Sequence, residues 1–337
     1  MSQSPKVVTI FGGSGFVGRY IARRMAKEGW RVRVAVRRPN EAVFVRPYGV
    51  VGQVEPILAN VRDDASVRAA IAGADVVVNC VSTLQESGKQ TFEALNDAGA
   101  GRVAMMAAKE GVGRLVHISA LGADLDSDSD SARTKAEGEQ AVLAAFPSAM
   151  ILRPSVIFGN EDQFFNRFAE MTKFGPVLPL VGGETLFQPV FVDDVAQAAC
   201  EGILGNSAGG IYELGGPEAA SLNDLMHRML HVIRRRRLVV NLPFFAGTLM
   251  GKALGLAQTL SLGLFTNTIL TTDQVKQLRV YNVVSEGAKT FADLGISPTG
   301  IDAVVESYLY QYRQYGQYAE LTESAKNLKG SPTTSDF

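Results

Sequence analysis

Short, continuous apolar runs alternate with amphipathic segments along the first half of the chain. Runs such as "VVTIF" (7–11) and "DVVVNCVS" (75–82) show little polar alternation, which is typical of parallel strands covered on both faces. The segment 17–29 instead repeats apolar residues at helical spacing. The expected strands are 7–11, 31–38, 75–82, 114–121 and 149–159, and the expected helices are 17–29, 63–74, 92–111 and 132–146. This repeating order predicts an α/β fold, a doubly wound parallel Rossmann-type sheet.

The pattern loosens after about residue 160. A short strand and a helix are expected over 188–204, a strand and turn over 209–218, and a helix with Ser221 as its N-cap over 221–237. These pieces suit a smaller C-terminal lobe. The expected domains are a dinucleotide-binding core over 1–160, rejoined by elements from about 188–215, a lobe with a docking segment over 161–320, and a polar flexible tail over 321–337.

Composition narrows the function mainly by exclusion. The 337 residues carry a formal net charge of −1, which gives no reason to expect nucleic acid as a partner. Cys80 and Cys200 lie in apolar stretches and are expected to be reduced core thiols. The three histidines are not spaced with cysteines or acids as metal ligands are. The first strand starts so close to Met1 that we expect no secretory signal or transit peptide, and a bacterial cytoplasmic location.

A glycine loop joins the first strand to the first helix. In "FGGSGFVG" (11–18), Gly12, Gly15 and Gly18 follow the strand directly. Glycines there allow a tight turn and a close backbone approach to a pyrophosphate, and the helix N-terminus offers free N–H groups to that anion. The loop predicts a bound dinucleotide.

The end of the second strand favours NADP(H) over NAD(H). A free ribose 2′-hydroxyl is usually held by a carboxylate about 20 residues past the glycines. Arg37 and Arg38 stand there instead, and no carboxylate occurs before Glu41. Two guanidinium groups would bind a 2′-phosphate. The alternative is that both arginines form a solvated strand end.

Four further stretches carry a family resemblance: "LANVRD" (58–63), "CVST" (80–83), "HISALGA" (117–123) and "LRPSVIFG" (152–159). With the glycine loop, they make the chain resemble the extended or atypical branch of the short-chain dehydrogenase/reductase superfamily over about residues 5–235. The resemblance implies adenine contacts at the end of the third strand, ribose contacts after the fourth, and nicotinamide contacts after "LRP". The expected cofactor-binding residues are Gly12, Ser14, Gly15, Phe16, Val17, Gly18, Arg37, Arg38, Asn60, Val61, Val81, Ser82, Thr83, Ser119, Lys135, Pro154, Ser155, Val156 and Phe158.

The catalytic pattern that this family implies is incomplete. Family members pair a serine on the fifth strand with Tyr-x-x-x-Lys on the next helix, where the tyrosine handles the proton that accompanies hydride transfer. Ser119 and Lys135 match, but Ser131 stands at the tyrosine position. A serine hydroxyl is a far weaker acid than a phenol of pKa ~10, and losing a positioned general acid costs ~10²–10⁴ in rate. We therefore expect Ser119, Ser131 and Lys135 to be vestigial, with "DSDSDS" (126–131) a solvated loop.

The C-terminal half resembles a more specific family. Stretches such as "FGPVLPLVG" and "NLPFFAGTLMGKALGL" are similar to the NADPH-binding accessory subunits of respiratory complex I, NADH:ubiquinone oxidoreductase, through about residue 320. That resemblance implies a tightly bound NADPH that is not turned over. It also implies subunits of the peripheral arm near the quinone region as partners, and a peripheral position on the cytoplasmic face of a bacterial inner membrane.

The segment 238–270 supports an assembly role on separate grounds. It contains one charge, Lys252, and follows the cationic run Arg234, Arg235, Arg236 and Arg237. Such a segment suits docking to a partner or to a membrane surface. The alternatives are a pair of lobe-core helices and a solvated helix end. Polar residues interrupt the uncharged stretch 253–272, so we do not expect a transmembrane helix.

Together these features favour a non-catalytic accessory subunit of complex I that holds NADP(H) as a structural cofactor. The alternatives are a working NADP-dependent reductase or epimerase with an unrecognised acid, and an NADP-sensing regulator that binds another protein.

Overall fold

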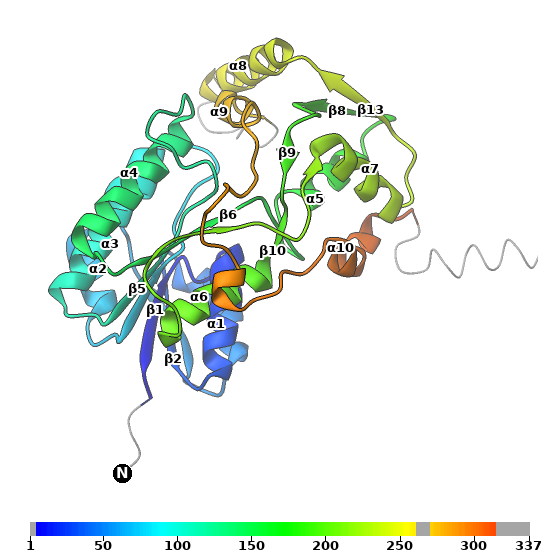
Figure 1. Cartoon of the computed structure of the whole chain (residues 1–337). Helices are drawn as coiled ribbons and strands as arrows, with labels where there is room; N and C mark the ends of the chain where they lie inside the picture. The colour runs from blue at the N-terminus through cyan, green and yellow to red at the C-terminus, as the bar shows by residue number, and fades with distance from the viewer. Residues whose placement is uncertain (1–4, 261–269, 315–337) are drawn as a thin grey trace, which may run out of the picture.

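A seven-stranded parallel sheet forms the centre of the molecule (Figure 1). The computed structural model describes residues 5–260 and 270–314. The strand order is β11-β6-β5-β4-β1-β2-β3, and every pairing within this sheet is parallel. The strands are β1 (Val7–Phe11), β2 (Arg31–Val36), β3 (Val54–Leu58), β4 (Val76–Asn79), β5 (Arg114–Ile118), β6 (Met150–Pro154) and β11 (Gly210–Leu214).

Helices cover both faces of this sheet. One buried cluster joins α1 (Phe16–Lys27) and α6 (Val192–Leu204) to one face. A second cluster joins α2 (Asp64–Ile71), α3 (Ala98–Lys109) and α4 (Asp130–Ala145) to the other. The predicted doubly wound α/β fold is confirmed.

Three local features differ from the predicted pattern. The strand β3 and the 3₁₀ segment η1 (Pro39–Tyr48) were not among the elements predicted from the sequence. In β3, the segment "VEPIL" carries Glu and Pro and so lacks a continuous apolar run; the proline is tolerated because β3 lies at the sheet edge. The predicted helix 92–111 begins with a π-helical turn, η2 (Glu93–Asp97), before α3. The predicted strand 149–159 divides into β6 and the short β7 (Ile157–Phe158).

The remaining elements build a smaller lobe around its own buried cluster, which includes Phe158, Phe165, Leu178 and Met226. Ser221 caps α7 as predicted, accepting a hydrogen bond from the Asp224 N–H at 3.1 Å. The lobe elements are α5 (Phe165–Met171), β8 (Val177–Val181), β9 (Leu186–Phe187), β10 (Val190–Phe191), β12 (Ala220–Ser221), α7 (Leu222–Val232), β13 (Leu238–Leu242), α8 (Phe244–Leu260), α9 (Thr272–Gln277), α10 (Asp302–Leu309) and η4 (Tyr310–Tyr312). One of the remaining elements, η3 (Ala292–Leu294), packs instead against the first cluster of the main sheet through Leu294 and the flanking Phe291 and Ile296.

The segment after α7 is not a pair of core helices. Residues 238–242 form β13, which pairs in parallel with β8, and α8 then lies beside α9 (Figure 1). The helix α7 ends at Val232, so the four arginines follow it rather than forming its last turn. The predicted tail 321–337 and residues 261–269 of the apolar segment lie outside the described residues.

Candidate cofactor site

A cavity of about 630 Å³ opens at the carboxyl ends of β1, β2, β3 and β4. The glycine loop forms one wall. Gly12 has a φ of +71°, and a Cβ there would lie 3.1 Å from the Cys80 carbonyl oxygen. A Cβ on Gly18 would lie only 2.4 Å from the Gly12 carbonyl oxygen. Glycine is therefore required at both positions, one for the turn and one for the packing of α1 under the loop.

The N-terminus of α1 faces this cavity without a side-chain cap. Its N-cap is Gly15, and no side chain accepts a hydrogen bond from the first turn. The free N–H groups and the positive end of the helix dipole are suited to an anion.

Most residues predicted to bind the adenine and pyrophosphate half of the cofactor line the cavity. Phe16, Val17 and Gly18 do not, because they lie on α1 beneath it. Thr83 also lies outside the lining, and its hydroxyl donates a hydrogen bond to the Gln85 carbonyl. The predicted residues on the lining are Gly12, Ser14, Gly15, Arg37, Arg38, Asn60, Val61, Val81 and Ser82. The lining also includes Glu41, Cys80, Gln90 and Leu95, which sequence reasoning missed.

The two arginines at the end of β2 differ in their surroundings. Arg38 forms an exposed ion pair with Glu41 at 3.0 Å. The exposed guanidinium of Arg37 has no hydrogen bond or ion pair to any residue that the structure describes. Arg37 is thus the cation available to an anionic ligand without a prior exchange of partners.

A loop borders the adenine side of the cavity. The Asn60 side-chain oxygen accepts a hydrogen bond from the Arg62 N–H at 3.2 Å, and the Arg62 guanidinium donates to the Lys89 carbonyl at 2.7 Å. These bonds tie the segment before η2 to the end of β3. Asn60 therefore has a structural task here besides any ligand contact.

The serine that matches the family's catalytic serine is engaged in a buried ionic network. Ser119 donates its hydroxyl to Glu139, whose side chain is 3 % exposed. Arg153 binds the same carboxylate with two nitrogens, and its closest approach is 2.6 Å. Because the Glu139 carboxylate holds this hydroxyl inside the fold, Ser119 is not oriented as a free donor toward the cleft.

The tyrosine position is closed. Ser131 is 7 % exposed and lies in the first turn of α4. The run 126–131 is therefore not wholly a solvated loop, because Ser129 is a buried N-cap and α4 begins at Asp130. Asp273 of α9 accepts hydrogen bonds from the Ser129 hydroxyl at 2.9 Å and the Asp130 N–H at 2.7 Å.

Lys135 lies one turn further along α4. Burial lowers its pKa to about 8, and the negative charge of Glu139 opposes that shift. No described residue accepts a hydrogen bond from its ammonium group. The lysine remains available to a ligand hydroxyl, although the proton donor it would assist is missing.

The π-helical turn η2 supplies another residue that the sequence did not indicate. Asn96, 3 % exposed, accepts a hydrogen bond from the Ser82 hydroxyl at 3.0 Å and donates to the Thr134 hydroxyl at 3.2 Å. Gly138 permits this approach, because a Cβ there would collide with the Asn96 carbonyl oxygen. Asn96 therefore links the ribose-side segment to α4.

Pro154, Ser155, Val156 and Phe158 follow along β6 and β7, outside the lining of the 630 Å³ cavity. The Asn282 side chain accepts hydrogen bonds from the Ser155 hydroxyl at 2.6 Å and the Val156 N–H at 3.1 Å. The segment that returns from α9 thus fixes the strand end predicted to pass beside a nicotinamide.

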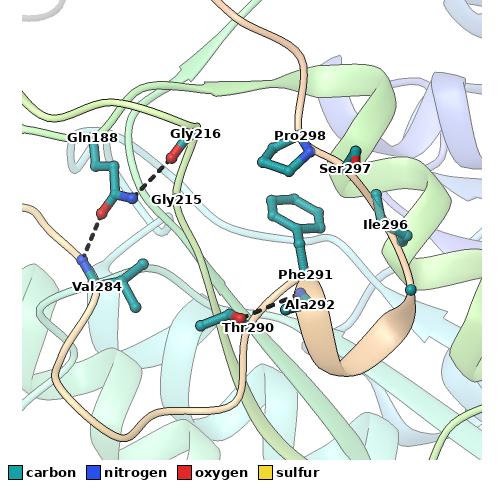
Figure 2. A pocket seen from close by; sticks show the side chains of 11 residues that line it. Gln188, Gly215, Gly216, Val284, Thr290, Phe291, Ala292, Ile296, Ser297 and Pro298 are labelled. Atoms are coloured by element: carbon teal, nitrogen blue, oxygen red, sulfur yellow. Dashed lines mark hydrogen bonds between the residues drawn. The ribbon is translucent and has the colours of Figure 1, made fainter.

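A second cavity, of about 510 Å³, lies beyond the end of β11 (Figure 2). Phe291 and Pro298 form one wall, and Gln188 spans the other by bonding the Gly216 carbonyl and the Val284 N–H. No titratable side chain lines it. It offers shape but no acid or base.

The sequence also led to expectations about the cysteines, a metal site and a membrane-spanning helix. Cys80 and Cys200 are unpaired, and burial raises the pKa of each to about 12. Among the described residues no group of His, Cys, Asp and Glu is arranged to hold a metal. Over the same residues, no helix has the length and apolarity needed to cross a bilayer.

The cationic run is partly engaged in the fold. Arg235 donates to the Tyr312 carbonyl and Arg237 to the Thr172 carbonyl, each at 2.9 Å. The apolar side chains of α8 are more accessible: Phe245 is 74 % exposed and Leu249 is 68 % exposed.

Comparisons with known proteins agree with this architecture. The model of the NAD dependent epimerase/dehydratase family matches residues 8–215. The mitochondrial NADH dehydrogenase [ubiquinone] 1 alpha subcomplex subunit 9 of Arabidopsis thaliana is 35 % identical over 331 residues, covering 96 % of this chain and 82 % of that protein. A ceramide reductase of Caulobacter vibrioides is 30 % identical over 239 residues, covering 70 % of this chain and 74 % of the reductase.

A solved structure supports the fold alone. DesIV, a dTDP-glucose 4,6-dehydratase from Streptomyces venezuelae with NAD and TYD bound, superposes with a TM-score of 0.68 at 19 % identity, over 94 % of this chain and 99 % of DesIV.

The family model and the similarity to the Arabidopsis protein decide the family. The chain belongs to the NAD dependent epimerase/dehydratase family, the extended branch of the short-chain dehydrogenases/reductases, and is a relative of the complex I alpha subcomplex subunit 9.

Proposed function

We propose that this protein is a non-catalytic accessory subunit of respiratory complex I that holds NADP(H) as a structural cofactor. The proposal depends mainly on two features together: a cleft lined by the residues expected for the adenine and pyrophosphate half of a dinucleotide, and a buried serine, Ser131, where a proton donor would stand. The relative from Arabidopsis, similar over nearly the whole chain, supports the complex I assignment.

The residues of the cleft fit a dinucleotide. The positions of Gly12 and Gly18 leave no room for a Cβ, and the uncapped start of α1 suits a pyrophosphate. Arg37, exposed and without a partner in the part of the chain described, favours a 2′-phosphate and hence NADP(H) over NAD(H). When bound, the nicotinamide can supply a hydride, but Ser131 is too short and too weak an acid to supply the accompanying proton.

The cofactor stabilises the fold in this account. A ligand that binds only the folded chain stabilises it by RT ln(1 + [L]/Kd), which is ~2.7 kcal/mol at 100 times Kd. The stabilised fold presents a docking surface to subunits of the peripheral arm near the quinone region, on the cytoplasmic face of a bacterial inner membrane. The exposed apolar side chains of α8 and the cationic run before β13 suit contact with a partner or with the membrane surface.

Purification from native membranes in mild detergent tests the proposal. We expect the protein to migrate with NADH dehydrogenase activity and to retain about one NADPH per chain. A free, soluble protein that oxidises NADPH with a carbonyl substrate would contradict it.

The second candidate is an active NADP-dependent reductase. The similarity to the Caulobacter ceramide reductase and the retained Lys135 favour it. Consumption of NADPH with a lipid ketone, abolished by Lys135→Ala, would support the reductase. An absence of turnover with such ketones would leave the accessory subunit as the function.

A further inference from the structure

The N-terminus of α4 is capped by a carboxylate that lies 143 residues away in the chain. Asp273 takes hydrogen bonds from both the Ser129 hydroxyl and the Asp130 N–H. A negative charge at a helix N-terminus is favourable, and hydrogen bonds to a carboxylate are stronger than neutral ones. Asp273 thereby fixes the first turn of α4.

Two more side chains of α9 hold the same turn. Lys276 donates to the Asp128 carbonyl at 2.8 Å, and Gln277 donates to the Ser129 hydroxyl at 3.2 Å. The helix α9 is itself stabilised by a capping box between Thr271 and Gln274. A preformed helix is thus attached to α4 through several specific bonds.

The other side of α9 packs against α8. Gly251 of α8 lies so near the backbone of α9 that a Cβ there would be 3.0 Å from the Thr272 nitrogen. Arg279, just after α9, stacks on the Phe244 ring at 5.3 Å. Figure 1 shows α9 beside α8. Any movement of α9 is therefore transmitted to the helix that exposes Phe245 and Leu249.

The first two turns of α4 also carry Ser131 and Lys135, which stand at the family's Tyr-x-x-x-Lys positions. Ser131 lies in the first turn, and Lys135, whose ammonium lacks an acceptor among the described residues, lies one turn later. Because Lys135 lies in the helix whose N-terminus Asp273 caps, a ligand bound to its ammonium group would restrict the motion of the capped turn.

We propose that α9 is a strap through which cofactor occupancy orders α8, with Asp273 as the residue that joins α9 to α4. This rests on the proposed function in taking NADP(H) as the ligand of the cleft and α8 as part of a docking surface. The strap gives a cofactor that undergoes no reaction a route to the docking helix. In the ligand-free chain the bonds of Asp273 already hold α9 against α4, and a ligand bound at Lys135 restricts the motion of both helices further and, with them, that of α8.

Hydrogen exchange on the isolated full-length chain tests the strap, with and without NADPH. In the native chain, NADPH should slow exchange of the amides at 11–18, 131–135, 272–277 and 245–255 by about 5-fold or more, the lower end of typical couplings between sites. In Asp273→Ala, NADPH should still protect 11–18 but no longer protect 245–255. Equal protection of 245–255 in both chains, or none in the native chain that does bind NADPH, would overturn the proposal.

Two further comparisons complete the test. Asp302→Ala is the matched control, because Asp302 also lies in the first turn of a helix, is exposed, and has no hydrogen bond to a described residue. It should behave as the native chain. If Asp273→Ala does not fold, the double variant Lys276→Ala and Gln277→Ala removes the other bonds to α4 and should reduce the protection of 245–255.

The outcome is separable from that of the proposed function. If NADPH fails to protect 11–18 in the native chain, the cofactor assignment is wrong. The part of the strap that depends on cofactor occupancy then fails as well. The link through Asp273 is tested separately by the ligand-free chains, where Asp273→Ala should speed exchange in both 131–135 and 245–255. Unchanged exchange at 245–255 would refute it, whether or not the protein migrates with complex I.

Discussion

Replacement of Arg37 by alanine should weaken NADPH binding while leaving NADH binding almost unchanged. In the part of the chain that the structure describes, Arg37 borders the cleft with no partner, so a 2′-phosphate gains its hydrogen bonds without breaking others. A hydrogen bond to a charged group contributes ~1.5–3 kcal/mol, and each 1.4 kcal/mol is tenfold in affinity. We therefore expect the Kd for NADPH to rise about 10- to 150-fold.

Arg38→Ala should have a smaller effect on NADPH. Arg38 must first leave Glu41, at 3.0 Å in an exposed pair, and such pairs are worth ~0–1 kcal/mol. Arg46→Ala, at an exposed position that does not line the cleft, serves as a charge-matched control. Titrations followed by nicotinamide fluorescence would measure all three variants against both nucleotides. Equal weakening of NADH and NADPH by Arg37→Ala would refute a 2′-phosphate contact and indicate a general change in the cleft.

Three other outcomes follow from the buried groups. Glu139→Gln should lower the free energy of unfolding by ~3 kcal/mol, because it removes the nearer carboxylate of Arg153 and leaves that guanidinium only its longer pair with Glu213 at 3.6 Å, whereas Glu137→Gln should change it by under ~1 kcal/mol; equal urea midpoints would contradict this. Burial lowers the pKa of His117 to about 4, and the positive charge of Lys135 lowers it further in the same direction. Between pH 6.5 and 4 the unfolded chain therefore binds a proton at this histidine, whereas the folded chain does not. Stability is then full above pH 6.5 and falls by up to ~3 kcal/mol toward pH 4, a slope that urea titrations should find reduced in His117→Gln. Ser131→Tyr should restore no reduction of carbonyl compounds and should lower the melting temperature, because Ser131 is buried and a phenol ring would not fit there without displacing its neighbours; NADPH oxidation by this variant would show that the site is open.

The sheet and the glycine loop could be predicted because their causes are local. Parallel strands read as continuous apolar runs, and the loop needs glycine at fixed spacing. The absence of a tyrosine proton donor could also be predicted, because Ser131 occupies the position that is set by its spacing from Lys135.

The engagement of Ser119 and of the start of α4 by other side chains could not be predicted from the sequence, because it depends on contacts between distant segments. Ser119 and Glu139 are 20 residues apart, and Asp130 and Asp273 are 143 apart. Only the folded lobe brings α9 onto α4. The strand β13 was missed for a similar reason: its apolar residues suit a helix or a strand, and pairing with β8 decides between them.

If the cofactor is held and not used, the redox state of the bound nucleotide should not change while complex I turns over. In purified native complex I oxidising NADH with a quinone, samples should be quenched over many turnovers and the nucleotide bound to this subunit released and assayed with an NADP-specific enzyme; it should remain NADPH in constant amount. Oxidation and re-reduction of that NADPH in step with NADH consumption would contradict the account.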